Sequence, residues 1–266
     1  MDASALTDRS YWDEVWAGAA PPTIDARDPH QARLDRCFSR WLGPGRRFLE
    51  VGAGGSPWPA HIARAHGAEA WGIDFSTAGL AAVERAAHSA GVAVRLVAAD
   101  LFAPDALPEG TFDVVYSGGF LEHFTDAPLV TRRLAALLRP GGVVVTTVPN
   151  LRGVNGLLQR LVDPACFRRH VVHEPATLDE AHGAARLVPR EAARYVGVLD
   201  LGSVNLASTA AWPRPARALL WRSLGALRWS AESIASSLGR TSGGRLLAPA
   251  ILGVYGKEDG GGGGGG

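Results

Sequence analysis

Lysine is almost missing from this chain of 266 residues. Lys257 is the only lysine, and arginine supplies the rest of the 27 basic residues. A lysine that forms a Schiff base, or one that binds phosphate in a Walker-type loop, is therefore not expected. We interpret the high content of arginine, alanine and glycine as the result of GC-rich codon usage, so it indicates little about function.

Cysteine is scarce as well, since Cys37 and Cys166 are the only two. Two cysteines exclude a disulfide framework and a four-cysteine zinc site. No group of histidine, cysteine and aspartate has the sequence spacing of metal ligands, so we expect no metal. The formal net charge of +1 argues against a nucleic-acid-binding protein, because such proteins are usually strongly basic.

Long apolar runs are absent too. No stretch of the chain reaches 18 apolar residues, so the sequence predicts no membrane-spanning helix. The first ten residues contain Asp2, Asp8 and Arg9 with no apolar run after them, which argues against a secretory signal. We therefore expect a cytoplasmic protein. Residues 260–266 are all glycine, and we expect them to form a disordered tail.

The sequence does contain a regular alternation of short apolar runs and amphipathic segments. Hydrophobic residues make up 47% of the chain, enough for a sizeable core. The alternation is typical of a parallel sheet covered by helices on both faces. The expected strands are 47–51, 70–74, 92–97, 112–116, 143–148, 194–201 and 246–255. The expected helices are 57–66, 76–90 and 129–138, the last of which ends at Pro140-Gly141-Gly142.

These elements predict an α/β protein with a doubly wound, mostly parallel, seven-stranded sheet. We expect residues 1–43 to form a helical N-terminal lid and residues 44–259 to form the main domain. Two segments, 151–190 and 206–245, are expected to cap that domain, and the second is a helical insertion before the last strand. The chain shows no internal repeat.

A glycine-rich turn follows the first expected strand. It reads Glu50-Val51-Gly52-Ala53-Gly54-Gly55-Ser56 and leads into a helix. Glycine lets the backbone turn sharply and lets a ligand approach without a Cβ atom in the way. Asp74 ends the next strand, 20 residues after Gly54. A carboxylate at this place can accept two hydrogen bonds from a ribose diol, because ligands bind beyond the carboxyl ends of parallel strands.

The same turn is also compatible with a nicotinamide dinucleotide site. Two features argue against that interpretation. The third glycine of the G-x-G-x-x-G pattern falls on Pro57, which has no N–H group for a pyrophosphate, and Glu50 adds a carboxylate where phosphates would lie. Single acidic residues also have simpler explanations. Asp74 can be an acidic residue near a helix N-terminus, and Asp100, which follows the expected strand 92–97, can be a solvated turn residue.

Five segments together resemble the class I S-adenosylmethionine-dependent methyltransferases. In chain order they are LEVGAGG, WGIDFS, AADLF, FDVVYSGGFLEHF and LLRPGGVVVTTVPN, and they cover about residues 46–150. The segment SYWDEVW near the N-terminus resembles the lid helix of family members that act on small molecules. The resemblance implies a Rossmann-like fold, S-adenosylmethionine as cofactor and S-adenosylhomocysteine as product. Ala53 departs from the cysteine of many members, at a tolerant position.

The resemblance also implies roles for individual residues. Gly52 and Gly54 would lie under the methionine and ribose of the cofactor, and Glu50 would order the turn and contact the amino group through water. Asp74 would bind both ribose hydroxyls. The remaining implied contacts are the adenine face for Phe75, the adenine amine for Asp100, the adenine ring for the N–H of Leu101, and the amino group for the carbonyl of Ser117.

Candidates for catalysis and acceptor binding come from the loops above the sheet. His123 follows the fourth strand and is the first candidate for a general base, although a histidine that packs against the next helix is the simpler explanation. The candidate acceptor-binding residues are Tyr11 and Trp12 on the lid, Asn150 after the fifth strand, and His170 and His173 on segment 165–175.

We expect methyl transfer to oxygen or nitrogen of a small molecule, with a natural-product intermediate as the first choice of acceptor. Segment 206–245 supports an alternative, because its arginines are interspersed with aromatic and aliphatic residues as in helices that lie on membranes. That pattern would suit a lipid-like quinone or isoprenoid acceptor and peripheral membrane contact. A solvated basic face is the simpler explanation. A non-catalytic cofactor-binding module also stays open, and the sequence leaves the oligomeric state undetermined.

Overall fold

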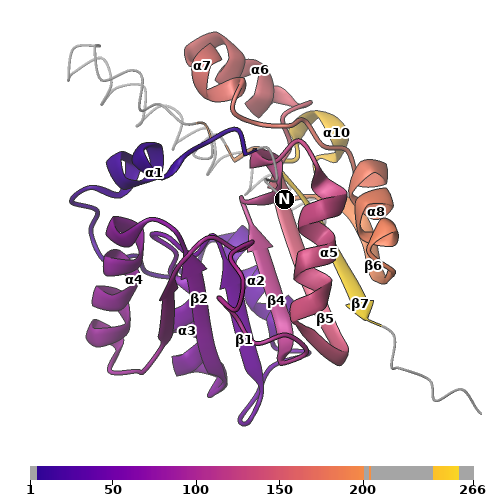
Figure 1. Ribbon diagram of the computed structural model, residues 1–266. Coiled ribbons are helices and arrows are strands. Elements are labelled where there is room, and N and C mark those ends of the chain that lie inside the picture. The colour runs from indigo at the N-terminus through magenta and orange to yellow at the C-terminus, as the bar shows by residue number, and fades with distance from the viewer. Residues whose placement is uncertain (1–4, 201–203, 205–241, 258–266) are drawn as a thin grey trace, which may run out of the picture.

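The computed structural model describes residues 5–200, residue 204 and residues 242–257. These residues form a seven-stranded sheet with the strand order β3-β2-β1-β4-β5-β7-β6. Strands β1 to β5 are parallel neighbours, and β7 runs antiparallel to both β5 and β6. Helices pack on both faces of this sheet (Figure 1). The predicted Rossmann-like, mostly parallel, seven-stranded fold is confirmed.

The element boundaries are as follows. The strands are β1 (Arg47–Val51), β2 (Glu69–Asp74), β3 (Arg95–Ala98), β4 (Phe112–Gly118), β5 (Leu138–Pro149), β6 (Leu187–Val196) and β7 (Ala250–Lys257). The helices are α1 (Arg9–Trp16), α2 (Pro29–Phe38), α3 (Trp58–His66), α4 (Thr77–Ala90), the short 3₁₀ turn η1 (Leu121–His123), α5 (Ala127–Leu137), α6 (Val154–Val162), α7 (Pro164–Phe167), α8 (Pro175–Ala184) and α10 (Gly244–Leu247).

The ends of helix α4 follow from its sequence. The Ser76 hydroxyl accepts the N–H of Gly79 at 3.1 Å, which satisfies one of the free donors of the first turn. Gly91 ends the helix in the left-handed conformation, with φ +67°, that glycine adopts at little cost. These two residues fix where the segment after β2 begins and ends, and so they place Asp74 directly before a helix N-terminus.

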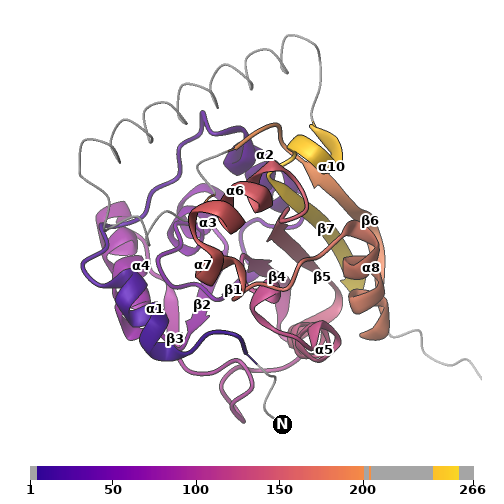
Figure 2. The same ribbon diagram turned by 90° about the horizontal axis from the view of Figure 1, so that it is seen from above.

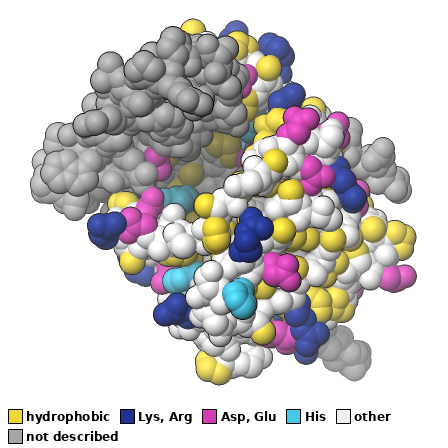
Figure 3. Space-filling view, turned by 90° about the vertical axis from the view of Figure 1, so that its left-hand side faces the viewer, with side chains coloured by type: hydrophobic (Ala, Val, Ile, Leu, Met, Phe, Trp, Pro, Cys, Tyr) yellow, Lys and Arg dark blue, Asp and Glu magenta, His cyan; other side chains and the backbone are white. Residues whose placement is uncertain are grey.

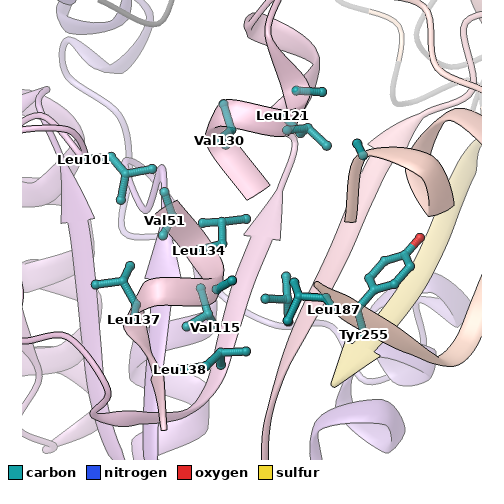
Figure 4. Packing of buried hydrophobic residues seen from close by; sticks show 14 of the residues in the cluster. Val51, Leu101, Val115, Leu121, Val130, Leu134, Leu137, Leu138, Leu187 and Tyr255 are labelled. Carbon is teal, nitrogen blue, oxygen red and sulfur yellow. The ribbon is translucent and has the colours of Figure 1, made fainter. Parts of the chain in front are cut away.

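Two apolar layers hold the helices against the sheet. Helices α2 and α3 pack on one face, where Phe38, Phe48 and Tyr116 are in contact with one another. Helices α5 and α8 pack on the other face, where Val115 and Leu134 belong to the larger cluster (Figure 4). Strands β1, β4, β5 and β7 contribute residues to both layers in alternation, as the side-chain period of two requires.

Strand β5 differs from its prediction at its start. Pro140-Gly141-Gly142 was expected to end the preceding helix, but α5 ends at Leu137 and β5 begins at Leu138. Leu138 pairs with Phe112 of β4, and the register shifts before Val143. A bulge of this kind inserts extra residues into one strand without ending it, and glycines favour the conformation that it needs.

The two last strands also have different boundaries from those expected. Strand β6 was expected at 194–201 and covers Leu187–Val196, and β7 was expected at 246–255 and covers Ala250–Lys257. Strand β6 lies at the edge of the sheet, and its pairing with β7 is irregular in two places. Pro189 is tolerated there because an edge strand has free N–H positions. The irregular pairing removes the alternation from which a strand is predicted.

The flanking segments pack in different places. Within 1–43, helix α2 packs on one face of the sheet with Phe38 in the core, whereas α1 packs against α4. Within 151–190, helices α6 and α7 lie above the middle of the sheet in the view from above (Figure 2). The glycine tail 260–266 and residues 206–241 of the predicted insertion 206–245 lie outside the described residues. In the described ranges, no helix is both long and apolar enough to cross a membrane.

Candidate active site

A cavity of about 690 Å³ opens at the carboxyl ends of β1, β2 and β4. Its lining comes from four places: the glycine-rich turn after β1, the end of β2, the loop after β3, and the loop after β4. Helix α1 supplies a further wall through Trp12 and Trp16. This is the place where ligands bind in open parallel sheets. A volume of this size suits a ligand with room for a second small molecule.

The floor of the cavity is the turn between β1 and α3, which is fastened to Asp74. The N–H of Gly54 donates to Oδ2 of Asp74 at 2.8 Å, and the N–H of Ser76 donates to Oδ1 at 2.7 Å. Burial raises the pKa of Asp74 against the opposing effect of these hydrogen bonds. Gly52 has φ +70°, and a Cβ atom there would lie 2.6 Å from the ring of Phe120. The turn therefore requires glycine at this position.

Glu50 places a buried carboxyl group beside this floor. The residue is 3% exposed and lines the cavity, and its Oε2 atom has no hydrogen-bond partner. Burial raises the pKa of Glu50 to about 8, against the opposing hydrogen bond with Ser56. An unpaired buried carboxylate is costly unless a ligand supplies a positive group. A ligand with a cationic end would satisfy the Glu50 side chain and favour its ionised form.

Trp16 is the main contact between the N-terminal helix and the floor. A Cβ atom on Gly55 would lie 2.4 Å from its ring, and a Cβ atom on Gly79 would lie 2.8 Å from it. Asp13 accepts a hydrogen bond from the Ser76 hydroxyl at 2.6 Å. Trp16 was not among the predicted site residues, although its spacing of four residues from Trp12 places both on one helical face.

His123 lies at the other end of the cavity, between the lid and the segment after α7. Its ring meets Trp12 edge to face with centroids 5.2 Å apart, and its Nδ1 is 3.0 Å from the carbonyl oxygen of Arg169. Burial lowers the pKa of His123 to about 4, and the nearby His170 adds to the shift. The imidazole is therefore neutral at pH 7 and is a weak proton acceptor, because a general base works best with a pKa near the operating pH.

The structure brings most of the predicted site residues together around this cavity. The predicted residues in its lining are Glu50, Gly52, Gly54, Asp74, Phe75, Asp100, Leu101, Trp12 and His123. Aromatic residues that were not predicted as site residues also line it, namely Trp16, Trp58, Phe102, Tyr116, Phe120 and Phe124. The spacing of Phe120 and Phe124 on the loop that carries His123 was a signal that could have identified both.

Five predicted residues lie outside the lining, and three have contacts that explain their positions. Ser117 is buried inside β4, directly before Gly118, which does line the cavity. Tyr11 packs under the guanidinium group of Arg169, 4.3 Å from its ring centroid. Asn150 is fully buried, and its Nδ2 donates to two main-chain carbonyls of the segment before β7, each at 2.8 Å. The structure thus gives Asn150 a role in fastening this segment to the end of β5.

His170 and His173 also lie outside the lining. The ring of His170 is close to His123, with centroids 4.6 Å apart. His173 is buried, and its Nε2 has no hydrogen-bond partner. Segment 165–175 therefore reaches the cavity wall through its contact with His123.

Around α1 and α4, the described surface carries acidic and basic side chains interspersed with one another (Figure 3).

Comparison with known proteins defines the class to which this fold and site belong. Residues 49–146 match the family model of a methyltransferase domain. Among solved structures, a SAM-dependent methyltransferase from Archaeoglobus fulgidus superimposes with a TM-score of 0.54 and 18% identity, over 85% of this chain and 92% of that one. At this identity the likeness shows the fold, which is that of S-adenosylmethionine-dependent methyltransferases.

The sequence relatives identify the family. The ubiquinone biosynthesis O-methyltransferase of Ralstonia nicotianae is 41% identical over 114 residues, which are 42% of this chain and 47% of that protein. The protein of the same name from Xanthomonas campestris pv. campestris is 30% identical over 218 residues, 81% of this chain and 78% of that protein. The Ralstonia match thus spans about half of the relative's length. The chain belongs to the class I S-adenosylmethionine-dependent methyltransferases.

The residues present fit the cofactor of this family. The unpartnered Oε2 of Glu50 suits the amino group of the methionine part, and the turn at Gly52 and Gly54 leaves main chain without side chains beside it. Asp74 has a carboxylate at the cavity wall for the two ribose hydroxyls. A dinucleotide would instead place phosphates beside two acidic side chains, which is unfavourable.

Proposed function

We propose that this protein transfers the methyl group of S-adenosylmethionine to a hydroxyl oxygen of a small phenol or catechol that is a precursor of a quinone, and releases S-adenosylhomocysteine and the hydroxyl proton. The observation that carries the proposal is the buried, unpartnered carboxyl group of Glu50 at the floor of a cavity of about 690 Å³. Asp74 beside it supplies the acceptor for a ribose diol.

The roles of the cofactor-binding residues follow from their positions. Glu50 would hold the ammonium group and Asp74 the ribose hydroxyls. Phe75, Asp100 and Leu101 lie at the ends of β2 and β3, where the adenine would fit. When bound, the sulfonium supplies an activated methyl group for a nucleophile that lies in line with the sulfur.

The protein's own contribution is to align the acceptor and to exclude water. Trp12, Phe120 and Phe124 present apolar rings to the cavity, and an aromatic acceptor would pack against them. His123 also lines this end of the cavity, and we propose that the acceptor hydroxyl lies next to it. Helix α1 forms one wall of the cavity, with Trp12 against His123 and Trp16 against Gly55.

A quinone-type acceptor has more support than the natural-product intermediate that the sequence analysis placed first. The two sequence relatives reported above are both named for ubiquinone biosynthesis. An aromatic, largely apolar wall suits a phenol or catechol with an isoprenoid tail. We keep oxygen as the methylated atom for the same reason. Peripheral membrane contact through 206–245 and a cytoplasmic location stay predictions from the sequence.

The test is a methylation assay with S-adenosylmethionine that carries an isotopic label in its methyl group. The acceptors are a catechol with a short isoprenoid tail, the same catechol without a tail, and a hydroxylated polyketide. We expect labelled methyl ether from the two catechols and faster turnover with the tail. Labelled product from the polyketide alone would overturn the quinone assignment. Absence of cofactor binding in calorimetry would overturn methyl transfer itself.

A further inference from the structure

We propose that Glu122, His123 and His170 form a binding site for one divalent transition-metal cation, of which zinc is the best match. The three residues come from η1 and from the segment after α7. One ligand atom from each lies within 4.8 Å of the others. Two ligands of a tetrahedral zinc ion lie about 3.3 Å apart, so small side-chain rotations would close the group around the ion.

The two histidines are oriented as metal ligands usually are. Nδ1 of His123 is 3.0 Å from the carbonyl oxygen of Arg169, and Nδ1 of His170 is 2.7 Å from that of Cys166. A carbonyl at this position holds the proton on Nδ1 and leaves the Nε2 lone pair available. This arrangement of a main-chain carbonyl behind an imidazole is the common outer shell of metal-binding histidines.

The buried side chain of Glu122 is a second, independent observation that supports the metal site. Its residue is 2% exposed, and its Oε2 has no hydrogen-bond partner. Its main-chain carbonyl accepts the N–H of Val171 at 2.6 Å, which fastens the segment that carries His170 against η1. A buried carboxylate oxygen beside two imidazoles lacks only a cation to satisfy it, and Arg169 is not available for this because its guanidinium group lies on Tyr11.

The donor set selects the kind of cation. Two imidazole nitrogens and one carboxylate oxygen suit zinc and its neighbours in the first transition row, whereas magnesium and calcium prefer oxygen ligands alone. Three protein ligands leave a coordination position open, as in catalytic zinc sites. Of the three residues, His123 also lines the cavity, and a cation bound here would supply a Lewis acid for an acceptor hydroxyl placed beside it. This last role rests on the proposed function, and the binding of the cation does not.

A second cluster in the described part of the chain provides the matched control. Asp35, His61 and His66 also lie within metal-binding distance. There, however, Oδ1 of Asp35 already bonds the Nε2 of His61 at 2.7 Å and of His66 at 2.8 Å. The potential ligand atoms thus satisfy one another, and a cation would have to break both hydrogen bonds. We expect no tight site at this cluster.

The test is zinc binding to chelator-stripped protein, measured by calorimetry and by metal analysis after gel filtration. We expect one equivalent of zinc per chain, at least 100-fold weaker binding in Glu122→Gln and His170→Ala, and unchanged binding in Asp35→Ala. Cobalt in place of zinc should give visible absorption bands that His170→Ala loses. Binding that survives in His170→Ala and disappears in Asp35→Ala would overturn the proposal, as would no zinc bound or more than one equivalent.

Cofactor binding keeps this test separate from the proposed function. Calorimetry of S-adenosylhomocysteine with the stripped wild type and with His170→Ala shows whether each protein is folded, since the cofactor residues lie at the other end of the cavity. Zinc that binds without any cofactor binding would contradict methyl transfer and support the metal site. Cofactor binding by a protein that binds no zinc would contradict the metal site and would be consistent with methyl transfer.

Discussion

The pH dependence of cofactor affinity provides the sharpest test of the role of Glu50. With a pKa of about 8, its carboxyl group is protonated in about nine molecules of ten at pH 7 in the free protein. A bound ammonium group favours the ionised form, so binding has to remove the proton. At pH 7 this step costs about 1.4 kcal/mol, which is a tenfold loss of affinity. Affinity should therefore rise about tenfold per unit from pH 6 to pH 8 and then level off.

The variant Glu50→Gln isolates this effect, because ionisations of the cofactor itself are common to both proteins. A charged hydrogen bond contributes about 1.5–3 kcal/mol, so we expect the variant to bind about 10- to 100-fold more weakly above pH 8. Near pH 6 the difference should almost disappear, since the wild-type carboxyl is then neutral as well. Calorimetry in two buffers of different ionisation enthalpy should record release of about one proton per cofactor at pH 7 from the wild type alone.

The same group affects the stability of the free protein in the opposite sense. The unfolded carboxyl ionises near pH 4.5, whereas the folded one stays protonated until about pH 8. The contribution to stability is complete below pH 4.5 and is lost as the pH rises towards 8. Glu50→Gln should therefore melt at a higher temperature than the wild type at pH 8. If the cofactor affinities of the wild type and of Glu50→Gln changed with pH by the same factor between pH 6 and pH 9, the role assigned to the Glu50 carboxyl group would be refuted.

Four further outcomes are expected. Asp74→Asn should weaken cofactor binding about 10- to 100-fold in calorimetry, because a charged acceptor for the ribose diol is lost. Asp113→Asn should lower the melting temperature and leave cofactor affinity unchanged, because that carboxylate accepts from three donors at the far end of the sheet. Gly55→Ala should weaken cofactor binding, because the new Cβ atom would collide with Trp16 and the backbone has a positive φ. In a Trp16→Ala background only the backbone strain remains, so the loss of affinity should be smaller. An equal loss of affinity in both backgrounds would contradict the contact between Gly55 and Trp16. His123→Ala should bind the cofactor normally and lose turnover, and full turnover would exclude His123 from the reaction.

The middle of the sheet could be predicted from the sequence, and the last strands could not. Residues 112–116 and 143–148 are short β-branched and apolar runs, and each became part of a buried strand. Strand β6 has no such run, since it lies at the edge, contains Pro189 and pairs irregularly with β7. Its start was therefore placed several residues too late. A run of apolar residues indicates a strand that is buried on both of its faces. An edge strand is not buried in this way, so its sequence lacks the run.

The site divides in a similar way. Spacing along the chain was enough to bring Gly54 and Asp74 together, because consecutive parallel strands end at the same edge of the sheet. No local pattern could predict that His170 lies beside His123, or that Trp16 rests on Gly55. These contacts depend on how α1 and the segment after α7 fold back over the sheet, which the packing of the whole domain determines.

The position of β7 between β5 and β6 has a consequence for how this protein can change. A strand made late in the chain separates two that are made earlier, so the residues between Val196 and Ala250 form an excursion whose two ends are held by the sheet. Lengthening such an excursion costs little, since the entropy of closing a loop grows only logarithmically. The length of this connection can therefore change at little cost while the strands on either side of it keep their places in the sheet.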